Sequence, residues 1–190
     1  MENSKANKNT FLKKAQTPLI LFLATITVAL VVVMKRVDKP LQSTIAPKGI
    51  VSFELARKFD NSQNIVNSWN EQEKLYAAFG LGIDYLFLFA YSIFFAVMIF
   101  KVANALMSRF KSFARLGFVL LWGQFLAAAL DATENFFLTQ LLFGSQRAWF
   151  ANYAFLCASL KFTLIFMAVV YILLGLVLLI KPSAGNKVAA

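Results

Sequence analysis

Four long apolar runs constrain this chain more than any other feature of its sequence. They cover residues 17–34, 79–100, 116–138 and 153–180, and each has at least 18 residues. About 20 helical residues, at roughly 1.5 Å of rise each, cross a hydrocarbon core about 30 Å thick. The runs are apolar on all sides, whereas a membrane β-strand alternates between two faces. The sequence therefore predicts an all-α polytopic membrane protein, with residues 1–190 as a single membrane domain folded into a four-transmembrane-helix bundle.

The distribution of basic residues predicts the orientation of the bundle. Lys and Arg gather in the N-terminal tail, the C-terminal tail and the second loop at residues 101–115, which has four basic residues and no acidic one. The third loop has Arg147 alone. By the positive-inside rule, we expect both termini and the second loop in the cytoplasm of a multi-pass protein of the bacterial inner membrane. Three basic residues directly after the first run argue against this orientation; they are Lys35, Arg36 and Lys39. Acidic residues of the same loop offset their charge in part.

Two scarce residue types exclude whole classes of chemistry. The chain has no histidine, which excludes bis-imidazole haem ligation, most zinc sites and Ser-His-Asp triads. Cys157 is the only cysteine, so neither an intrachain disulfide nor a Cys-x-x-Cys pair forms. The formal net charge of +10 is explained by contact with anionic lipid, at about 1 kcal/mol per basic residue near the surface. We therefore expect membrane lipid as a partner and not nucleic acid, and the sequence indicates no particular protein partner.

The first loop, at residues 35–78, is too long for a simple connector. Apolar residues recur in it at near-helical spacing over residues 50–59, and a second piece runs from an N-cap at Asn61 or Ser62 to Trp69. We expect two short amphipathic helices on the outer face of the bundle, with Trp69 at the level of the lipid headgroups. A solvated loop without fixed structure is the alternative.

Ionisable side chains lie inside three of the apolar runs. They are Asp84, Asp131, Glu134 and Lys161, with Asn135, Gln124 and Tyr91 as uncharged companions. Four unpaired charges near the middle of a bilayer would cost roughly 10 kcal/mol, at about 2.5 to 3.5 kcal/mol each. Counted from the outer helix ends, the three acids lie about 6 to 10 Å deep, and the long stem of the lysine reaches back to the same depth. The sequence therefore predicts one polar layer in the outer leaflet.

Helical spacing turns these side chains toward a common interior. The polar residues of the third run share one stripe, and those of the second run share one side. In the fourth run, small residues share a face with Lys161, and small residues allow helix backbones to approach closely. We expect a polar pocket between the second, third and fourth runs.

The charges of this layer suggest its chemistry. Three carboxylates against one ammonium leave two negative charges, which a desolvated layer holds only with protons or a cation. Asp84, Asp131 and Glu134, with the Asn135 carbonyl, offer the oxygen ligands that Mg²⁺ or Ca²⁺ prefers. The first hypothesis is a pocket that binds a cation or a polar lipid headgroup. In a lipid-modifying enzyme the same three carboxyls would be catalytic, and the substrate would be held by Asn135, Lys161, Tyr91 and Gln124.

Two other functions stay open. In a non-catalytic scaffold or assembly subunit, Lys161 would pair with one carboxylate and the buried charges would hold the helices together. Translocation of protons or ions is less favoured, because only Gln124 and Thr163 continue the polar layer toward the cytoplasm. Outside the runs, Glu54 precedes Arg57 and Lys58 at i+3 and i+4, which favours a surface ion pair over a cover for the pocket.

Three motifs support this pattern. They are Gly-Ile-Val-Ser-Phe-Glu-Leu-Ala at residues 49–56, Asp-Tyr-Leu-Phe at 84–87 and Leu-Asp-Ala-Thr-Glu-Asn at 130–135, with Trp69 and Tyr91 between them. Together they resemble a group of uncharacterised small bacterial membrane proteins with four helices. The resemblance covers the outer loop through the third run, roughly half of the chain, and implies no activity. Lys161 lies outside it.

Overall fold

The structure is a bundle of four long helices with three short helical segments at one end. The computed structural model describes residues 2–180, with side chains from residue 18 onward, and these residues form no β-strand. The elements are α1 (Glu2–Asp38), η1 (Lys39–Leu41), α2 (Ile50–Glu54), α3 (Phe59–Ser68), α4 (Glu71–Leu106), α5 (Lys111–Leu142) and α6 (Trp149–Ile180). The predicted all-α bundle is confirmed.

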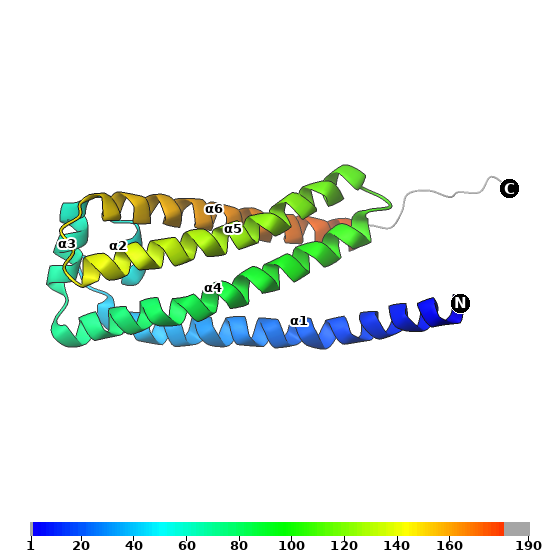
Figure 1. Ribbon diagram of the computed structural model, residues 1–190, viewed down its shortest axis with the longest axis horizontal. Helices are drawn as coiled ribbons and strands as arrows, with labels where there is room; N and C mark the ends of the chain where they lie inside the picture. The colour runs from blue at the N-terminus through cyan, green and yellow to red at the C-terminus, as the bar shows by residue number, and fades with distance from the viewer. Residues whose placement is uncertain (1, 181–190) are drawn as a thin grey trace.

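The long helices run antiparallel in chain order, as Figure 1 shows. Helix α4 lies between α1 and α5, and α6 packs against both α4 and α5. The α4–α5 turn lies at the same end of the bundle as the N-terminus, whereas α2, α3 and the α5–α6 connection cover the opposite end (Figure 1). This arrangement packs α2 and α3 against α5 and α6 at that end of the bundle.

Each of the four long helices contains a segment that is long and apolar enough to cross a membrane. These segments are Pro18–Leu41, Glu71–Leu106, Lys111–Leu142 and Trp149–Ile180. Large apolar side chains face outward along them, among them Trp122, at 72% exposed, and Phe166, at 67%. Such surfaces are stable in lipid and not in water. The chain is therefore a multi-pass helical membrane protein.

The helices extend beyond the apolar runs that predict them. Helix α4 begins at Glu71, where a capping box joins Asn70 and Glu73 through both of their backbone N–H groups. The predicted loops at 35–78 and 101–115 accordingly shorten to the segments between α1 and α4 and between α4 and α5. Polar residues are good helix formers, so a helix continues past the hydrocarbon boundary that ends an apolar run.

The two short helices of the first loop are present, but two details predicted for them are wrong. Helix α3 begins at Phe59 with Lys58 as its N-cap, one turn before the predicted caps at Asn61 or Ser62. Trp69 is only 2% exposed, so its ring packs inside the protein and does not contact lipid headgroups. Its indole N–H donates to the Leu41 carbonyl at 3.0 Å, so this tryptophan fastens the end of α3 to the segment that follows α1.

Helix α2 is held at its first residue by the end of α1. The Ile50 backbone N–H donates to a carboxylate oxygen of Asp38 at 2.6 Å. The preceding Gly49 has a φ of +53°, and a Cβ there would overlap the Asp38 carboxylate. This contact sets the direction of α2, and the last residue of α2 is Glu54.

The interior is apolar at both ends, and the polar layer crosses it near the α2–α3 end. On α4, Asp84 lies between the buried Leu81 and Leu88. On the antiparallel α5, the polar residues lie between the buried Ala127 and Leu138. The apolar neighbours thus pair up across the helices, Leu81 with Leu138 in one cluster and Leu88 with Ala127 in another, so the acids between them share one height.

Candidate functional site

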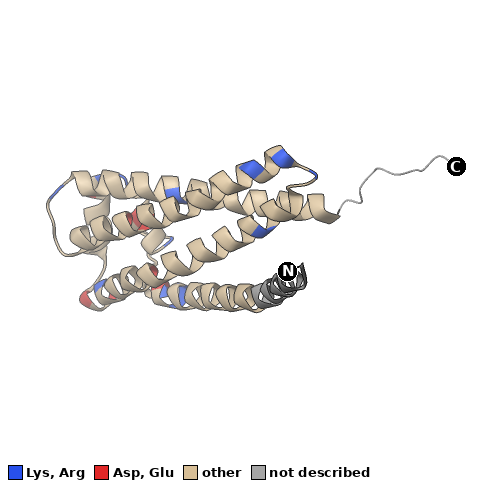
Figure 2. Ribbon diagram, turned by 45° about the vertical axis from the view of Figure 1, so that its right-hand side comes forward, with Lys and Arg blue, Asp and Glu red and all other residues tan. Residues whose placement is uncertain are grey.

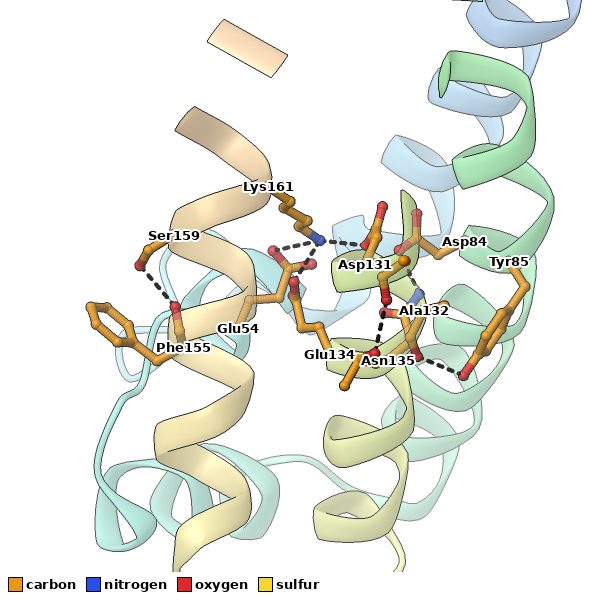
Figure 3. A network of polar contacts seen from close by, with 12 residues as sticks. Glu54, Asp84, Tyr85, Asp131, Ala132, Glu134, Asn135, Phe155, Ser159 and Lys161 are labelled. Carbon is orange, nitrogen blue, oxygen red and sulfur yellow. Dashed lines mark hydrogen bonds and ion pairs between the residues drawn. The ribbon is translucent and has the colours of Figure 1, made fainter. Parts of the chain in front are cut away.

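Lys161 on α6 is the centre of the polar layer (Figure 3). Its side-chain nitrogen Nζ lies 2.6 Å from Asp131 Oδ1 and 2.9 Å from Glu134 Oε2. The lysine is 4% exposed, and the two acids are 2% and 0% exposed. The acids are one turn apart on α5, so both carboxylates reach the same ammonium. The structure therefore brings together three of the four ionisable residues predicted for the layer.

The fourth, Asp84, joins the layer through an amide. Asn135 Nδ2 donates to Asp84 Oδ2 at 2.8 Å, and the asparagine is fully buried. Nearby, the Tyr85 hydroxyl donates to the Ala132 carbonyl at 3.2 Å (Figure 3). These contacts connect α4 to α5 at the height where α5 connects to α6. Asn135 thus orients a carboxylate through its amide nitrogen, while its carbonyl oxygen, the predicted ligand or substrate contact, has no hydrogen-bond partner among the described residues.

Glu54 belongs to the site, although the sequence pattern favoured a surface ion pair for it. The residue is 7% exposed, and its Oε2 lies 3.9 Å from Lys161 Nζ (Figure 3). The surface interpretation fails because Arg57 turns away: its backbone φ is +61°, and its guanidinium carbon lies 5.6 Å from the centre of the Phe155 ring. A signal for the inward position was available, since Glu54 is one turn after Ile50 in a stretch whose only other polar residue is Ser52.

The environment of Glu54 favours its neutral form. Burial raises the pKa of this carboxyl from 4.5 to about 7; the Lys161 ammonium lowers it, and Asp84, Asp131 and Asp38 raise it further. Glu54 lies outside the spanning segments, at the end of α2. It therefore gains or loses its proton near neutral pH.

A cavity of about 200 Å³ opens beside the charged cluster. Its polar end contains Glu54, Asp84, Tyr91, Asp131 and Lys161. Its other walls are largely apolar and are formed by Met34, Ile50, Val51, Phe87, Phe162 and Ile165. Lys35 and Asp38 of α1 are further charged residues in these walls. Helices α1, α2, α4, α5 and α6 all contribute to it, so the predicted pocket between three helices has two additional walls.

Of two uncharged residues predicted for the pocket, Tyr91 lines the cavity and Gln124 does not. Tyr91 lines the cavity, is 2% exposed, and its hydroxyl has no hydrogen-bond partner among the described residues. Gln124 lies two turns away on α5 and does not line the cavity. Its amide donates to the carbonyls of Leu120 at 3.2 Å and Leu164 at 3.4 Å. Gln124 therefore links α5 to α6, and the structure does not support its predicted contact with a substrate.

The arrangement of the acids does not support the predicted metal site at Asp84, Asp131 and Glu134. Within residues 2–180, no group of three His, Cys, Asp or Glu side chains is arranged to hold a metal ion. The ammonium of Lys161 takes the place between Asp131 and Glu134 that a cation would need. Asp84 is not paired with Lys161, and its Oδ2 accepts a hydrogen bond from the Asn135 amide.

The charge of the cluster is unbalanced when every group is ionised. Four carboxyls surround one ammonium, which leaves three negative charges, one more than the sequence indicated because Glu54 is included. Burial makes such an excess costly unless protons or a positively charged guest compensate it. The cavity beside the cluster gives room for that guest.

Comparison of the chain with protein-family models, with curated proteins and with solved structures finds no match.

Proposed function

We propose that this protein binds the polar headgroup of a membrane lipid in its intramembrane cavity. One observation carries the proposal, which is a cavity of about 200 Å³ with buried charged groups at one end and largely apolar walls elsewhere, where Lys35 and Asp38 are the charged exceptions. A lipid has the same division into a polar head and apolar chains. Ligand pockets characteristically combine apolar walls with a few convergent polar groups.

Access from the bilayer supports a lipid over a soluble metabolite. The cavity is lined on one side by Met34 of α1 and on the other by Phe162 and Ile165 of α6. Phe162 is 40% exposed on the outer surface of its helix. A headgroup that enters between α1 and α6 would leave its acyl chains against these apolar side chains, where they remain in lipid.

Native mass spectrometry of the full chain, extracted with its membrane, tests this proposal. Ile165→Trp puts a large indole into the cavity that Ile165 lines. The control Phe166→Trp puts the same indole at the neighbouring position, where the side chain is 67% exposed on the outer surface. We expect the first variant to lose tightly bound lipid and the second to keep it. If both variants retain lipid equally, the lipid does not bind in the cavity.

The orientation predicted from the basic residues is part of the proposal. Figure 2 marks Lys and Arg positions in blue at the α4–α5 end of the bundle, the end at which α1 begins. If this end is cytoplasmic, the cavity lies in the outer leaflet of a bacterial inner membrane. Reporter fusions at the N-terminus and in the α5–α6 connection distinguish the two orientations.

A catalytic version of the proposal keeps the same residues. Asp84, Asp131 and Glu134 would act on the bound lipid, and Glu54, whose pKa is about 7, is suited to exchange a proton at neutral pH. Incubation with lipid extracts, followed by mass analysis of the products, tests it. Any product must disappear in Asp84→Asn.

A scaffold function is supported by one specific observation, the double pairing of Lys161 with α5. In a scaffold, exchanging the partners through Lys161→Asp together with Asp131→Lys restores the fold and every phenotype. For a binding site, the exchange restores the fold and leaves lipid retention altered, because both residues line the cavity.

A further inference from the structure

The polar end of the cavity indicates which headgroup it accepts, and the inference rests on the proposed lipid-binding function. The charged cluster carries three uncompensated negative charges when all groups are ionised, and three of its four carboxyls line the cavity together with the Lys161 ammonium. A headgroup with only a phosphate would add to this excess. A headgroup with an ammonium would compensate it, since opposite charges buried together lower each other's cost.

Unsatisfied hydrogen-bond acceptors beside the cavity favour a group that donates. Glu54 Oε2 and the Tyr91 hydroxyl oxygen are both buried, and neither has a hydrogen-bond partner in the described part of the chain. Their residues are 7% and 2% exposed, and both line the cavity. Asp84 lines the same end and accepts the Asn135 amide through one of its two oxygens. A primary ammonium has three N–H donors, which matches three acceptor side chains.

Aromatic rings complete the environment of a cation. The rings of Phe87 and Tyr91 lie with their centres 5.2 Å apart, and both residues line the cavity. The face of an aromatic ring attracts a cation, most strongly where water is excluded. At the α1 side, the exposed Lys35 supplies a positive charge for a phosphate group.

We propose that the bound lipid is a zwitterionic phospholipid with a primary ammonium, of the phosphatidylethanolamine type. Its ammonium contacts Glu54, Asp84 and Tyr91, and its phosphate faces Lys35. A quaternary ammonium carries the same charge without N–H donors and therefore satisfies fewer of these acceptors.

The test is a competition between lipids with identical acyl chains. The purified full chain in detergent is mixed with equal amounts of phosphatidylethanolamine, phosphatidylcholine and phosphatidylglycerol, and native mass spectrometry counts each bound lipid. We expect phosphatidylethanolamine to exceed phosphatidylglycerol by about tenfold, which one charge-assisted hydrogen bond suffices to provide. Soluble phosphoethanolamine serves as a further competitor. If it displaces the lipid at equal concentration, the ligand is soluble and the lipid assignment is overturned.

Variants tie the preference to the site. Glu54→Gln and Asp84→Asn should reduce the preference to near unity, whereas Asp60→Asn, at an exposed position of α3, should leave it unchanged. Lys35→Gln changes an exposed residue, so it should fold normally and weaken retention of phosphatidylethanolamine several-fold. Retention and preference that are unaltered in Lys35→Gln and in correctly folded Glu54→Gln would overturn the assignment.

The failures of the two proposals differ. If lipid is retained and Ile165→Trp abolishes retention, but phosphatidylglycerol binds as well as phosphatidylethanolamine, only the ammonium assignment falls. If Ile165→Trp and Phe166→Trp retain the same lipid as the parent, the cavity is not the binding site and both proposals fall.

Discussion

Replacing Lys161 with methionine should destabilise this protein far more than an ordinary lysine substitution. The change keeps most of the side-chain volume and removes an ammonium that is 2.6 Å from Asp131 and 2.9 Å from Glu134. Removing one partner of a buried ion pair costs about 3 to 5 kcal/mol, because the other charge stays buried without compensation. A single interhelical hydrogen bond in a membrane averages only about 0.6 kcal/mol. The larger figure applies because Lys161 is 4% exposed and has two carboxylates within hydrogen-bond distance.

The chain provides a matched control for this substitution. Lys74 Nζ also lies 2.9 Å from a carboxylate, that of Glu71, but the glutamate side chain is 91% exposed. Exposed pairs contribute about 0 to 1 kcal/mol, so Lys74→Met should change the free energy of unfolding by no more than that. Reversible unfolding in mixed micelles by SDS, followed by tryptophan fluorescence, measures both variants. A triple variant that adds Asp131→Asn and Glu134→Gln to Lys161→Met should recover most of the loss. If Lys161→Met and Lys74→Met are equally stable, the ammonium does not hold the layer together.

Three further changes test separate parts of the structure. Folding raises the pKa of Glu54 from 4.5 to about 7, so the native state retains its proton to higher pH. The stability of the parent relative to Glu54→Gln should therefore fall by about 3 kcal/mol as pH rises from 4.5 to 7, and parallel pH profiles would contradict this. Gly117→Ala should cost about 1 to 3 kcal/mol by overlap with the Tyr171 hydroxyl, and Tyr171→Phe in the same chain should relieve much of the loss of melting temperature. Mg²⁺ or Ca²⁺ should give the parent no more thermal stabilisation than Asp131→Asn, and saturable stabilisation lost in that variant would restore the metal hypothesis.

The sequence predicted the spans and most of the charged layer because both follow from local rules. Length and apolarity identify a membrane helix, since lipid requires every backbone group to be satisfied within it. Spacing along a helix predicted that Asp131 and Glu134 share a face, and the depth count brought Lys161 to them. These rules predicted that the three residues meet in one layer, and the structure places Lys161 Nζ 2.6 and 2.9 Å from the two carboxylates.

The remaining parts depend on how α2 and α3 dock, which no spacing rule describes. The position of Glu54 is set by the contact between Asp38 and the Ile50 backbone, 12 residues apart along the chain. Trp69 is buried because a carbonyl 28 residues away, that of Leu41, accepts its N–H. Loop residues of these types are common at membrane surfaces, so the local pattern favoured exposure for both. The cavity wall from α1 was missed because that run contains no ionisable residue before Lys35.

Charges from separate helices face one interior cavity, and we propose that a lipid headgroup enters it. Crystals of the full chain grown from a lipidic mesophase that contains phosphatidylethanolamine test it most directly. We expect Lys161 between Asp131 and Glu134, with headgroup density against Glu54 and Tyr91. Side chains that point outward to lipid, or a cavity closed by its own apolar walls, would contradict it.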